Sequence, residues 1–251
     1  MANAESLKDA VKNHYDRMLG PVYSWIIGDF DTACRMNTDL LASLGLRSDR
    51  GAVALDLGCG PGCQSVPLAN AGFKVTAIDF CESLLAELQF HAGKLPIRAV
   101  HDDILNFPAH ITDSPELIVC MGDTLVHLPD VDAVENLISD ICDRLQPGGT
   151  FVASLRDYSL PPPCGAARFL PVRNSEDRIF TCFLEYRGDT IEVHDILHAR
   201  VDGEWRLHVS QYQKLRLDYR LVIGFLQDRG MAVDSLPGKD GMIVIKATKP
   251  A

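Results

Sequence analysis

A short apolar run that breaks directly into a glycine turn constrains the fold of this 251-residue chain most strongly. Residues 52–62 read Ala-Val-Ala-Leu-Asp-Leu-Gly-Cys-Gly-Pro-Gly. A run this short, bounded by turn residues, is typical of a buried parallel strand. Gly58, Gly60 and Gly62 can take backbone conformations closed to other residues and let a ligand come close to the main chain. The apolar periodicity that follows predicts a helix over 62–71, so a ligand is expected at the carboxyl end of the strand.

A second acid stands at the predicted tip of the next strand. Residues 74–78 alternate in polarity and lead to Asp79, where a carboxylate can accept hydrogen bonds from both hydroxyl groups of a ribose. The turn lacks the third-glycine spacing of the dinucleotide fingerprint. Asp56 also stands two residues before the first glycine, where NAD-binding proteins usually have an apolar residue. A glycine turn with strand-end acids in some other doubly wound protein is the alternative.

Residues 55–62, Leu-Asp-Leu-Gly-Cys-Gly-Pro-Gly, resemble motif I of the class I S-adenosylmethionine-dependent methyltransferases. The resemblance implies that the turn backs the methionine part of S-adenosyl-L-methionine, that the acid on the second strand holds its ribose, and that S-adenosyl-L-homocysteine is the product. The cofactor-binding residues implied around the first two strands are Asp56, Gly58, Cys59, Gly60, Asp79 and Phe80.

The pattern of predicted elements indicates one α/β domain with an insertion. From 52 to 157 strands alternate with helices, which favours a parallel sheet. The predicted strands are 52–57, 74–79, 97–102, 116–122 and 149–156, and the predicted helices are 62–71, 82–91 and 131–145. After residue 175 the runs 179–186, 190–201 and 205–217 are rich in β-formers and separated by tight-turn residues, which predicts three antiparallel strands. A helix from 218 or 219 through 228 and two last strands, 231–235 and 242–247, follow.

We therefore expect a doubly wound, seven-stranded Rossmann-like sheet, the count that the resemblance also implies. Residues 1–48 would form an N-terminal helical cap, 49–157 and 218–251 the cofactor-binding core, and 158–217 an inserted three-stranded antiparallel lid.

The composition of the chain limits the classes of partner that we expect it to bind. The formal charge of −10 repels phosphate backbones, so a nucleic-acid substrate is disfavoured. No apolar stretch is long enough to span a bilayer, and the first eight residues lack the apolar core of a secretory signal, so we expect a cytoplasmic protein with no membrane partner. The eight cysteines are scattered without paired metal spacing, which predicts reduced thiols and no metal site. The oligomeric state is left open, with a homo-oligomer as one outcome.

The third predicted strand ends in two adjacent acids, Asp102 and Asp103. A carboxylate at this place can accept a hydrogen bond from the adenine amino group while an apolar neighbour covers the ring. Asp103, followed by Ile104, matches this feature of the resembled family better, and Asp102 is the alternative. The alternative is that both acids are solvated residues of a turn and bind no ligand.

The loop after the fourth strand narrows the resemblance. Residues 121–130, Met-Gly-Asp-Thr-Leu-Val-His-Leu-Pro-Asp, are similar to the corresponding loop of the glycine N-methyltransferase and glycine-sarcosine methyltransferase group. The resemblance implies that Met121, Thr124 and His127 contact the cofactor, that Tyr23 lies near the sulfonium, that Arg156 holds an acceptor carboxylate, and that Tyr15, Tyr158 and Tyr212 line the acceptor pocket. Each of three residues also has a structural alternative. Arg156 could pair with an acid, and Tyr212 could be a core residue. His127 could be a hydrogen-bonded histidine at the start of a helix.

Two departures from that group bear on the acceptor. The group has asparagine where this chain has Asp123, and a carboxylate there attracts a cationic acceptor or accepts a proton. The arginine that binds the cofactor carboxylate in the group has no aligned match, and Arg35 is the nearest substitute.

The reaction that these residues predict is methyl transfer from S-adenosyl-L-methionine to a small amino-acid-like amine with a carboxylate. The alternatives are an O- or S-methyltransferase that acts on another small metabolite and a non-catalytic protein that binds the cofactor.

Overall fold

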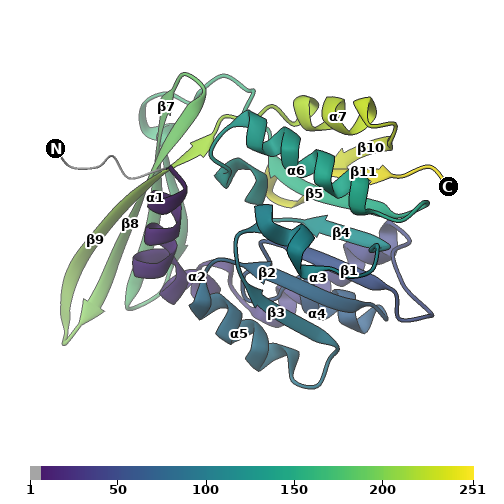
Figure 1. Cartoon of the computed structure of the whole chain (residues 1–251). Coiled ribbons are helices and arrows are strands. Elements are labelled where there is room, and N and C mark those ends of the chain that lie inside the picture. Colours follow the sequence, from purple (N-terminus) through teal and green to yellow (C-terminus); the bar gives the residue numbers. More distant parts are fainter. Residues whose placement is uncertain (1–6) are drawn as a thin grey trace.

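The computed structural model describes residues 7–251, and the first six residues, on which the predicted cap and the expected absence of a signal partly rest, lie outside this range. A large sheet covered by helices forms the body of the protein, and a smaller antiparallel sheet stands beside it (Figure 1). No helix among the described residues is both long and apolar enough to cross a membrane.

The large sheet has seven strands in the order β10-β11-β5-β4-β1-β2-β3. Their bounds are β1 Val53–Leu57, β2 Lys74–Asp79, β3 Ile97–His101, β4 Leu117–Cys120, β5 Thr150–Arg156, β10 Ala232–Pro237 and β11 Met242–Thr248. Strands β1 to β5 are parallel, and β11 runs antiparallel to β5 and β10. The strand order reverses between β1 and β4, and ligands of such sheets bind at the carboxyl ends of the strands at that point. The expected seven-stranded fold is confirmed.

Helices cover both faces of this sheet (Figure 1). They are α3 Phe30–Ser43, α4 Ser65–Asn70, α5 Glu82–Ala92, α6 Val131–Arg144 and α7 Tyr219–Asp228. Alternate strand residues point to opposite faces, so Leu55 and Leu57 pack into the apolar cluster under α6 and α7, while Ala54 packs into the cluster under α3, α4 and α5.

The insert contains one strand more than the sequence pattern predicts. Its four antiparallel strands run in the order β6-β7-β8-β9, with bounds β6 Phe169–Asn174, β7 Arg178–Arg187, β8 Thr190–Val201 and β9 Glu204–Leu215. Every residue of β6 is exposed, and its pairing shifts register between Pro171 and Arg173. An exposed edge strand that contains proline carries no alternation of polarity, which is why the prediction of three strands was wrong.

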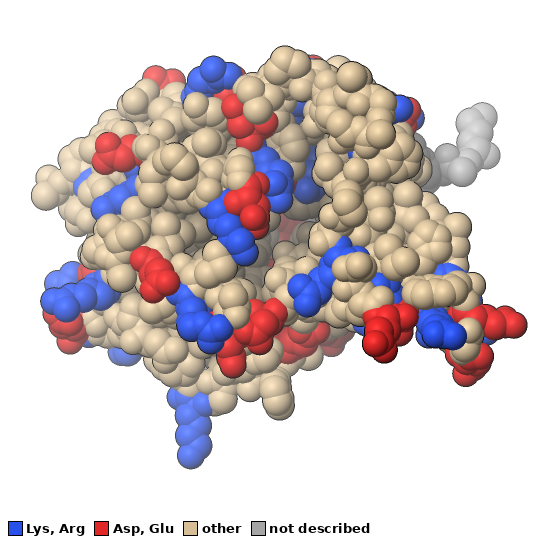
Figure 2. All heavy atoms as spheres, turned by 180° about the vertical axis from the view of Figure 1, so that it is seen from behind, with Lys and Arg blue, Asp and Glu red and all other residues tan. Residues whose placement is uncertain are grey.

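The N-terminal segment lies between the two sheets (Figure 1). It consists of α1 Leu7–His14, a π-helical turn over Tyr15–Leu19 and α2 Gly20–Ile27. Gly20 packs closely on the first turn of α5, because an added Cβ would lie 2.8 Å from the Ser83 hydroxyl oxygen. The molecular surface is hollowed between the body and the insert, and both basic and acidic side chains line the rim of this hollow (Figure 2).

Gly72→Ala is expected to lower the free energy of unfolding by at least about 2 kcal/mol. Gly72 has φ +96°, and a Cβ at this position would lie 2.0 Å from the Ser48 carbonyl oxygen, so backbone must move. Urea unfolding followed by circular dichroism measures the change.

Gly188→Ala is the matched control. Gly188 has φ +58°, and nothing lies within 4 Å of its added Cβ. This change should therefore cost only the left-handed backbone strain of about 1 kcal/mol. Equal losses for the two variants would show that Ser48 imposes no steric limit.

Candidate active site

Two buried carboxylates stand at the tips of β1 and β2. Asp79 accepts hydrogen bonds from the Gly60 N–H at 2.8 Å and the Cys81 N–H at 2.9 Å. Asp56 accepts one from the Ser65 hydroxyl at 2.6 Å, while its Oδ1 is buried without a partner. Burial raises the pKa of both carboxyls, and the charge of Asp79 contributes to raising the pKa of Asp56 to about 7. Among residues 7–251 no basic side chain bonds to either carboxyl, so both acids lack a counter-charge, which fits a ligand that carries a positive group.

The glycines of the turn form a cradle with little spare room. A Cβ at Gly58 would lie 2.5 Å from the Thr124 side chain, whereas a Cβ at Gly60 would meet nothing nearer than the Tyr23 ring at 3.8 Å. Cys59 is buried between them. The residues of the turn fit the methionine end of S-adenosylmethionine, since an unpartnered acid and a close main chain are what an ammonium and sulfonium group require.

The two candidate acids after β3 differ in their hydrogen-bond partners. Asp102 accepts hydrogen bonds from Asn106 at 2.8 Å and from His110 at 2.6 Å, and these bonds lower its pKa to about 2. Asp103 caps the following 3-10 helix, Ile104–His110, by accepting from the Leu105 N–H. Ile104 is buried. Asp102 is thus held by its own loop, and Asp103 with Ile104 stays the predicted adenine contact.

The loop after β4 presents Asp123 at the junction of the two sheets. Its backbone is left-handed, with φ 74°, and its side chain is 5% exposed. One carboxylate oxygen accepts from the Arg156 N–H at 3.0 Å, and the other accepts from the Tyr158 hydroxyl at 2.5 Å and from Lys214 Nζ at 3.0 Å. Burial opposes ionisation, but Lys214 and the Tyr158 hydroxyl outweigh it, so the pKa of Asp123 is lowered.

Lys214 supplies the positive charge of this site, and the sequence interpretation missed it. Burial disfavours its charge, but Tyr158, Tyr212 and Asp123 raise its pKa well above the ordinary value. The signal was available, because Lys214 follows Tyr212 by two residues on a strand and must share its face.

The Arg156 side chain, which the resemblance assigns to an acceptor carboxylate, turns away from Asp123. The Arg156 guanidinium is exposed and donates to the Asp240 carbonyl at 2.7 Å, and Arg156 contacts Asp123 only through its main-chain N–H.

Aromatic rings from four separate elements converge beside the Asp123 carboxylate. The Tyr15 ring lies 6.1 Å from Tyr23, 5.4 Å from Phe80 and 5.8 Å from His127, and the Tyr212 ring lies 5.5 Å from His127. Burial lowers the pKa of His127 to about 3 and raises that of Tyr23 to about 12, so both side chains are neutral at pH 7. The buried Nδ1 of His127 has no hydrogen-bond partner.

Met121 is the remaining residue of this loop with a predicted cofactor role, and its contacts lie within the protein. Met121 is buried, and its carbonyl accepts from the Thr124 hydroxyl at 2.7 Å.

The structure brings together six of the predicted side chains next to the glycine turn: Tyr15, Tyr23, Tyr158, Tyr212, His127 and Asp123. Their assignment to cofactor or acceptor stays a prediction.

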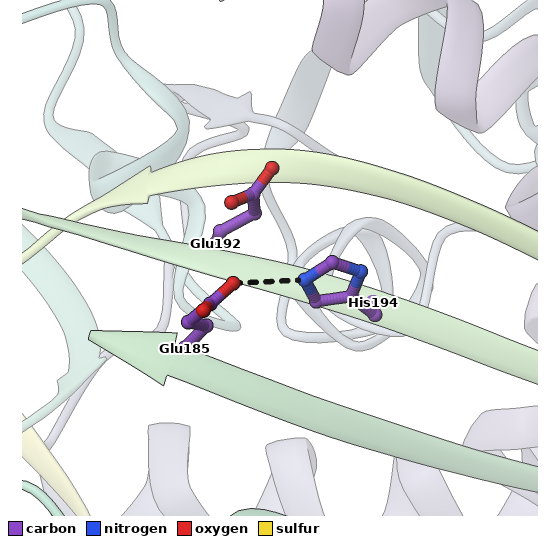
Figure 3. A group of neighbouring side chains, drawn as sticks. All are labelled: Glu185, Glu192 and His194. Carbon is purple, nitrogen blue, oxygen red and sulfur yellow. Dashed lines mark ion pairs between the residues drawn. The ribbon is translucent and has the colours of Figure 1, made fainter. Parts of the chain in front are cut away.

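One group with the spacing of metal ligands occurs among residues 7–251, and it lies in the insert. Glu185, Glu192 and His194 place their ligand atoms within 4.8 Å of one another on β7 and β8 (Figure 3). Arg187 contacts both carboxylates, at 2.8 Å and 2.7 Å. The guanidinium offsets the charge of the two acids, while Glu192 Oε2 and His194 Nε2 are buried without a hydrogen bond from the described residues.

Comparison with known proteins defines the class. Residues 54–149 match the family model described as a methyltransferase domain. The CcbJ methyltransferase from Streptomyces caelestis has the same fold, with a TM-score of 0.73 at 17% sequence identity over 99% of this chain and 100% of that chain. Residues 54–149 therefore match a methyltransferase domain, and the chain has the fold of S-adenosylmethionine-dependent methyltransferases.

Curated relatives match over a shorter part of the chain and differ in the atom they methylate. The chain is 28% identical to the ubiquinone biosynthesis O-methyltransferase of Proteus mirabilis, over 49% of this chain and 50% of that protein. It is 27% identical to the glycine N-methyltransferase of Rattus norvegicus, over 49% and 47%. The chain thus spans about half the length of the curated relatives it matches, and these matches leave N- and O-methylation equally open.

Replacing Asp56 with asparagine should flatten the pH dependence of stability. A carboxyl whose pKa rises from 3.8 to about 7 on folding favours the folded state below pH 3.8, and this contribution is lost as the pH rises through about 7. The wild-type protein should therefore lose stability over this window by an amount that Asp56→Asn does not show. Thermal unfolding at a series of pH values measures the difference.

The control is Asp234→Asn, which alters an exposed carboxylate on β10. Its stability profile should follow that of the wild type. Parallel profiles for Asp56→Asn and the wild type would contradict the raised pKa.

Proposed function

We propose that this protein transfers a methyl group from S-adenosyl-L-methionine to a small amine that also carries a carboxylate. The observation that carries the proposal is the buried Asp123–Lys214 ion pair, which stands among the tyrosines beside the glycine turn. Similarity to both N- and O-methyltransferases supports the reaction class, and this ion pair favours the amine.

The donor side uses the residues of the first three strand ends. Asp79 would hold the ribose, Asp56 the methionine ammonium group, and Asp103 with Ile104 the adenine. Bound there, S-adenosylmethionine supplies an electrophilic methyl group on a sulfonium. The Tyr23 ring stands over Gly60, so it can exclude water from this end of the site and face the cation with its π-electrons.

The acceptor side is electrically balanced. Asp123 and Lys214 are 5% and 15% exposed and cancel each other's charge. A zwitterion can exchange with this pair charge for charge, with its carboxylate on Lys214 and its amine on Asp123, so no charge is left unpaired. A neutral phenol offers no such exchange and would leave the pair as it is.

The protonation states of the site suit a nucleophilic amine. The lowered pKa of Asp123 keeps its carboxylate ionised, so it can pair with the ammonium form of the acceptor on binding. The ammonium group loses one proton to solvent before its nitrogen attacks, and Asp123 then accepts a hydrogen bond from the remaining N–H and orients it. His127 stays neutral because burial and Lys214 lower its pKa to about 3. It therefore adds no positive charge that would repel the sulfonium.

The insert takes part in the proposed reaction as the wall of the acceptor pocket. Tyr212 and Lys214 both come from β9. This is consistent with a lid function for residues 158–217 and a cap function for residues 1–48, which carry Tyr15 and Tyr23.

Asp79→Ala is expected to weaken S-adenosylmethionine binding by roughly 1–3 kcal/mol, because it removes a hydrogen-bonding carboxylate and the anchor of the Gly60 N–H. Isothermal titration calorimetry measures the affinity. Asp102→Asn is the control, since that side chain is bonded to its own loop, and its affinity should match the wild type. Equal affinity for Asp79→Ala would remove Asp79 from the ribose site.

Lys214→Met is expected to reduce kcat/KM for the acceptor by roughly 2–4 kcal/mol in transition-state stabilisation, with little change in cofactor affinity. The assay is formation of S-adenosyl-L-homocysteine with a panel of amino acids, betaines, thiols and phenols. Because Lys214→Met leaves Asp123 buried and unpaired, Asp123→Asn/Lys214→Met provides a neutral pair for comparison.

Arg156→Ala is the matched comparison for this test. Its guanidinium is exposed and bonded to Asp240, so this change should cost less than Lys214→Met. A greater loss for Arg156→Ala would return the carboxylate grip to Arg156. A best acceptor without a carboxylate would overturn the zwitterion proposal and favour the O- or S-methyltransferase, and binding without turnover would favour a non-catalytic protein.

A further inference from the structure

A buried polar network joins α1 to the inner face of the insert. His14 is 2% exposed and Asp195 is 1% exposed. His14 Nε2 lies 2.9 Å from Asp195 Oδ2, and His14 Nδ1 lies 2.7 Å from the Ser210 hydroxyl oxygen. Cys182 donates to the other Asp195 oxygen at 2.9 Å. Every polar atom of the imidazole and the carboxylate is therefore partnered.

The network fixes the orientation of the imidazole. An ionised carboxylate only accepts hydrogen bonds, so His14 Nε2 carries a proton and donates it to Asp195. In the neutral ring Nδ1 then accepts from Ser210. Two bonds to two different strands, β8 and β9, leave the ring no freedom to rotate.

The held ring continues into the aromatic cluster of the site. The His14 ring lies 4.3 Å from the Tyr212 ring at an interplanar angle of 31°, and the Tyr212 ring lies 5.5 Å from the His127 ring at 27°. The residue after His14 is Tyr15, whose ring meets His127 edge-on at 5.8 Å. One side chain thus sets the position of aromatic rings from two elements.

Two features of the surrounding backbone favour the same placement of these rings. Ser210, Tyr212 and Lys214 alternate along β9 and share one face, so a bond at Ser210 also fixes the register of the other two toward α1. The helix changes from α to π at Tyr15, directly after His14, and π-turns are frequent at functional sites.

We propose that His14, held by Asp195 and Ser210, is a positioning residue that places Tyr212 and Tyr15 for the acceptor. The inference rests on the proposed function, because the placement matters only if an acceptor binds beside these rings. Among the described residues, His14 forms no contact with Asp123, so its effect on the acceptor would be indirect.

Two variants test the proposal while keeping the fold. His14→Gln retains a donor for Asp195 but loses the ring. His14→Phe/Asp195→Leu retains a ring but replaces the buried ion pair by apolar packing, an exchange that often preserves stability. Both should lower kcat at least tenfold, with the dissociation constant of S-adenosylmethionine changed less than threefold. Val222→Ala, a buried change in α7, is the control for lost stability and should keep kcat within twofold.

A second readout does not depend on turnover. With 3-fluorotyrosine at position 212, the ¹⁹F resonance should shift in both His14 variants and stay in place in Val222→Ala. A folded His14 variant with kcat within twofold of the wild type, or with an unmoved resonance, would overturn the positioning role. Absence of turnover by the wild type with every acceptor would instead refute the proposed function, and the resonance would still report whether His14 holds Tyr212.

Discussion

The Asp123 carboxylate accepts hydrogen bonds from three separate parts of the chain, and through them the two sheets meet where the candidate site forms. The end of β5 contributes the Arg156 N–H, the start of the insert contributes the Tyr158 hydroxyl, and β9 contributes Lys214. Because a buried charge is costly without partners, loss of any one of these bonds weakens the hold of the insert on the body. The left-handed backbone at Asp123 adds strain that this network must support.

Charge is distributed differently on the two sides of the site. The carboxyl ends of β1 and β2 carry two buried acids, and no basic side chain of the described residues bonds to either, whereas Asp123 and Lys214 balance each other. The first arrangement suits a ligand with net positive charge at that end, and the second suits a ligand that is neutral overall but charged at both ends. The tyrosines and His127 between them are uncharged at pH 7, so they separate the two halves without adding a field of their own.

Fold likeness reaches across nearly the whole chain at 17% identity, while the curated relatives align over about half of it. Residues 54–149, which match the methyltransferase domain, include the ends of β1 to β4, where we propose that the cofactor binds. The groups proposed to select the acceptor, Tyr158 and Lys214, and the His14–Asp195 pair lie outside that range. We therefore expect the shared fold to provide the donor site and the inner face of the insert to select the acceptor.

The sequence by itself determined the seven-stranded core, the glycine turn and the acids at the strand tips, because apolar periodicity and glycine spacing are local signals. It failed at β6, where an exposed edge strand carries no pattern. It also missed Lys214, although the spacing to Tyr212 places both on one face of a strand, and His14, whose partner is distant in the sequence. Only the tertiary structure decided that Lys214 faces Asp123 while the Arg156 side chain turns to Asp240, and that His14 meets Asp195, 181 positions away. Pairing of distant charges follows from how the two sheets pack, and no local property of the chain encodes that contact.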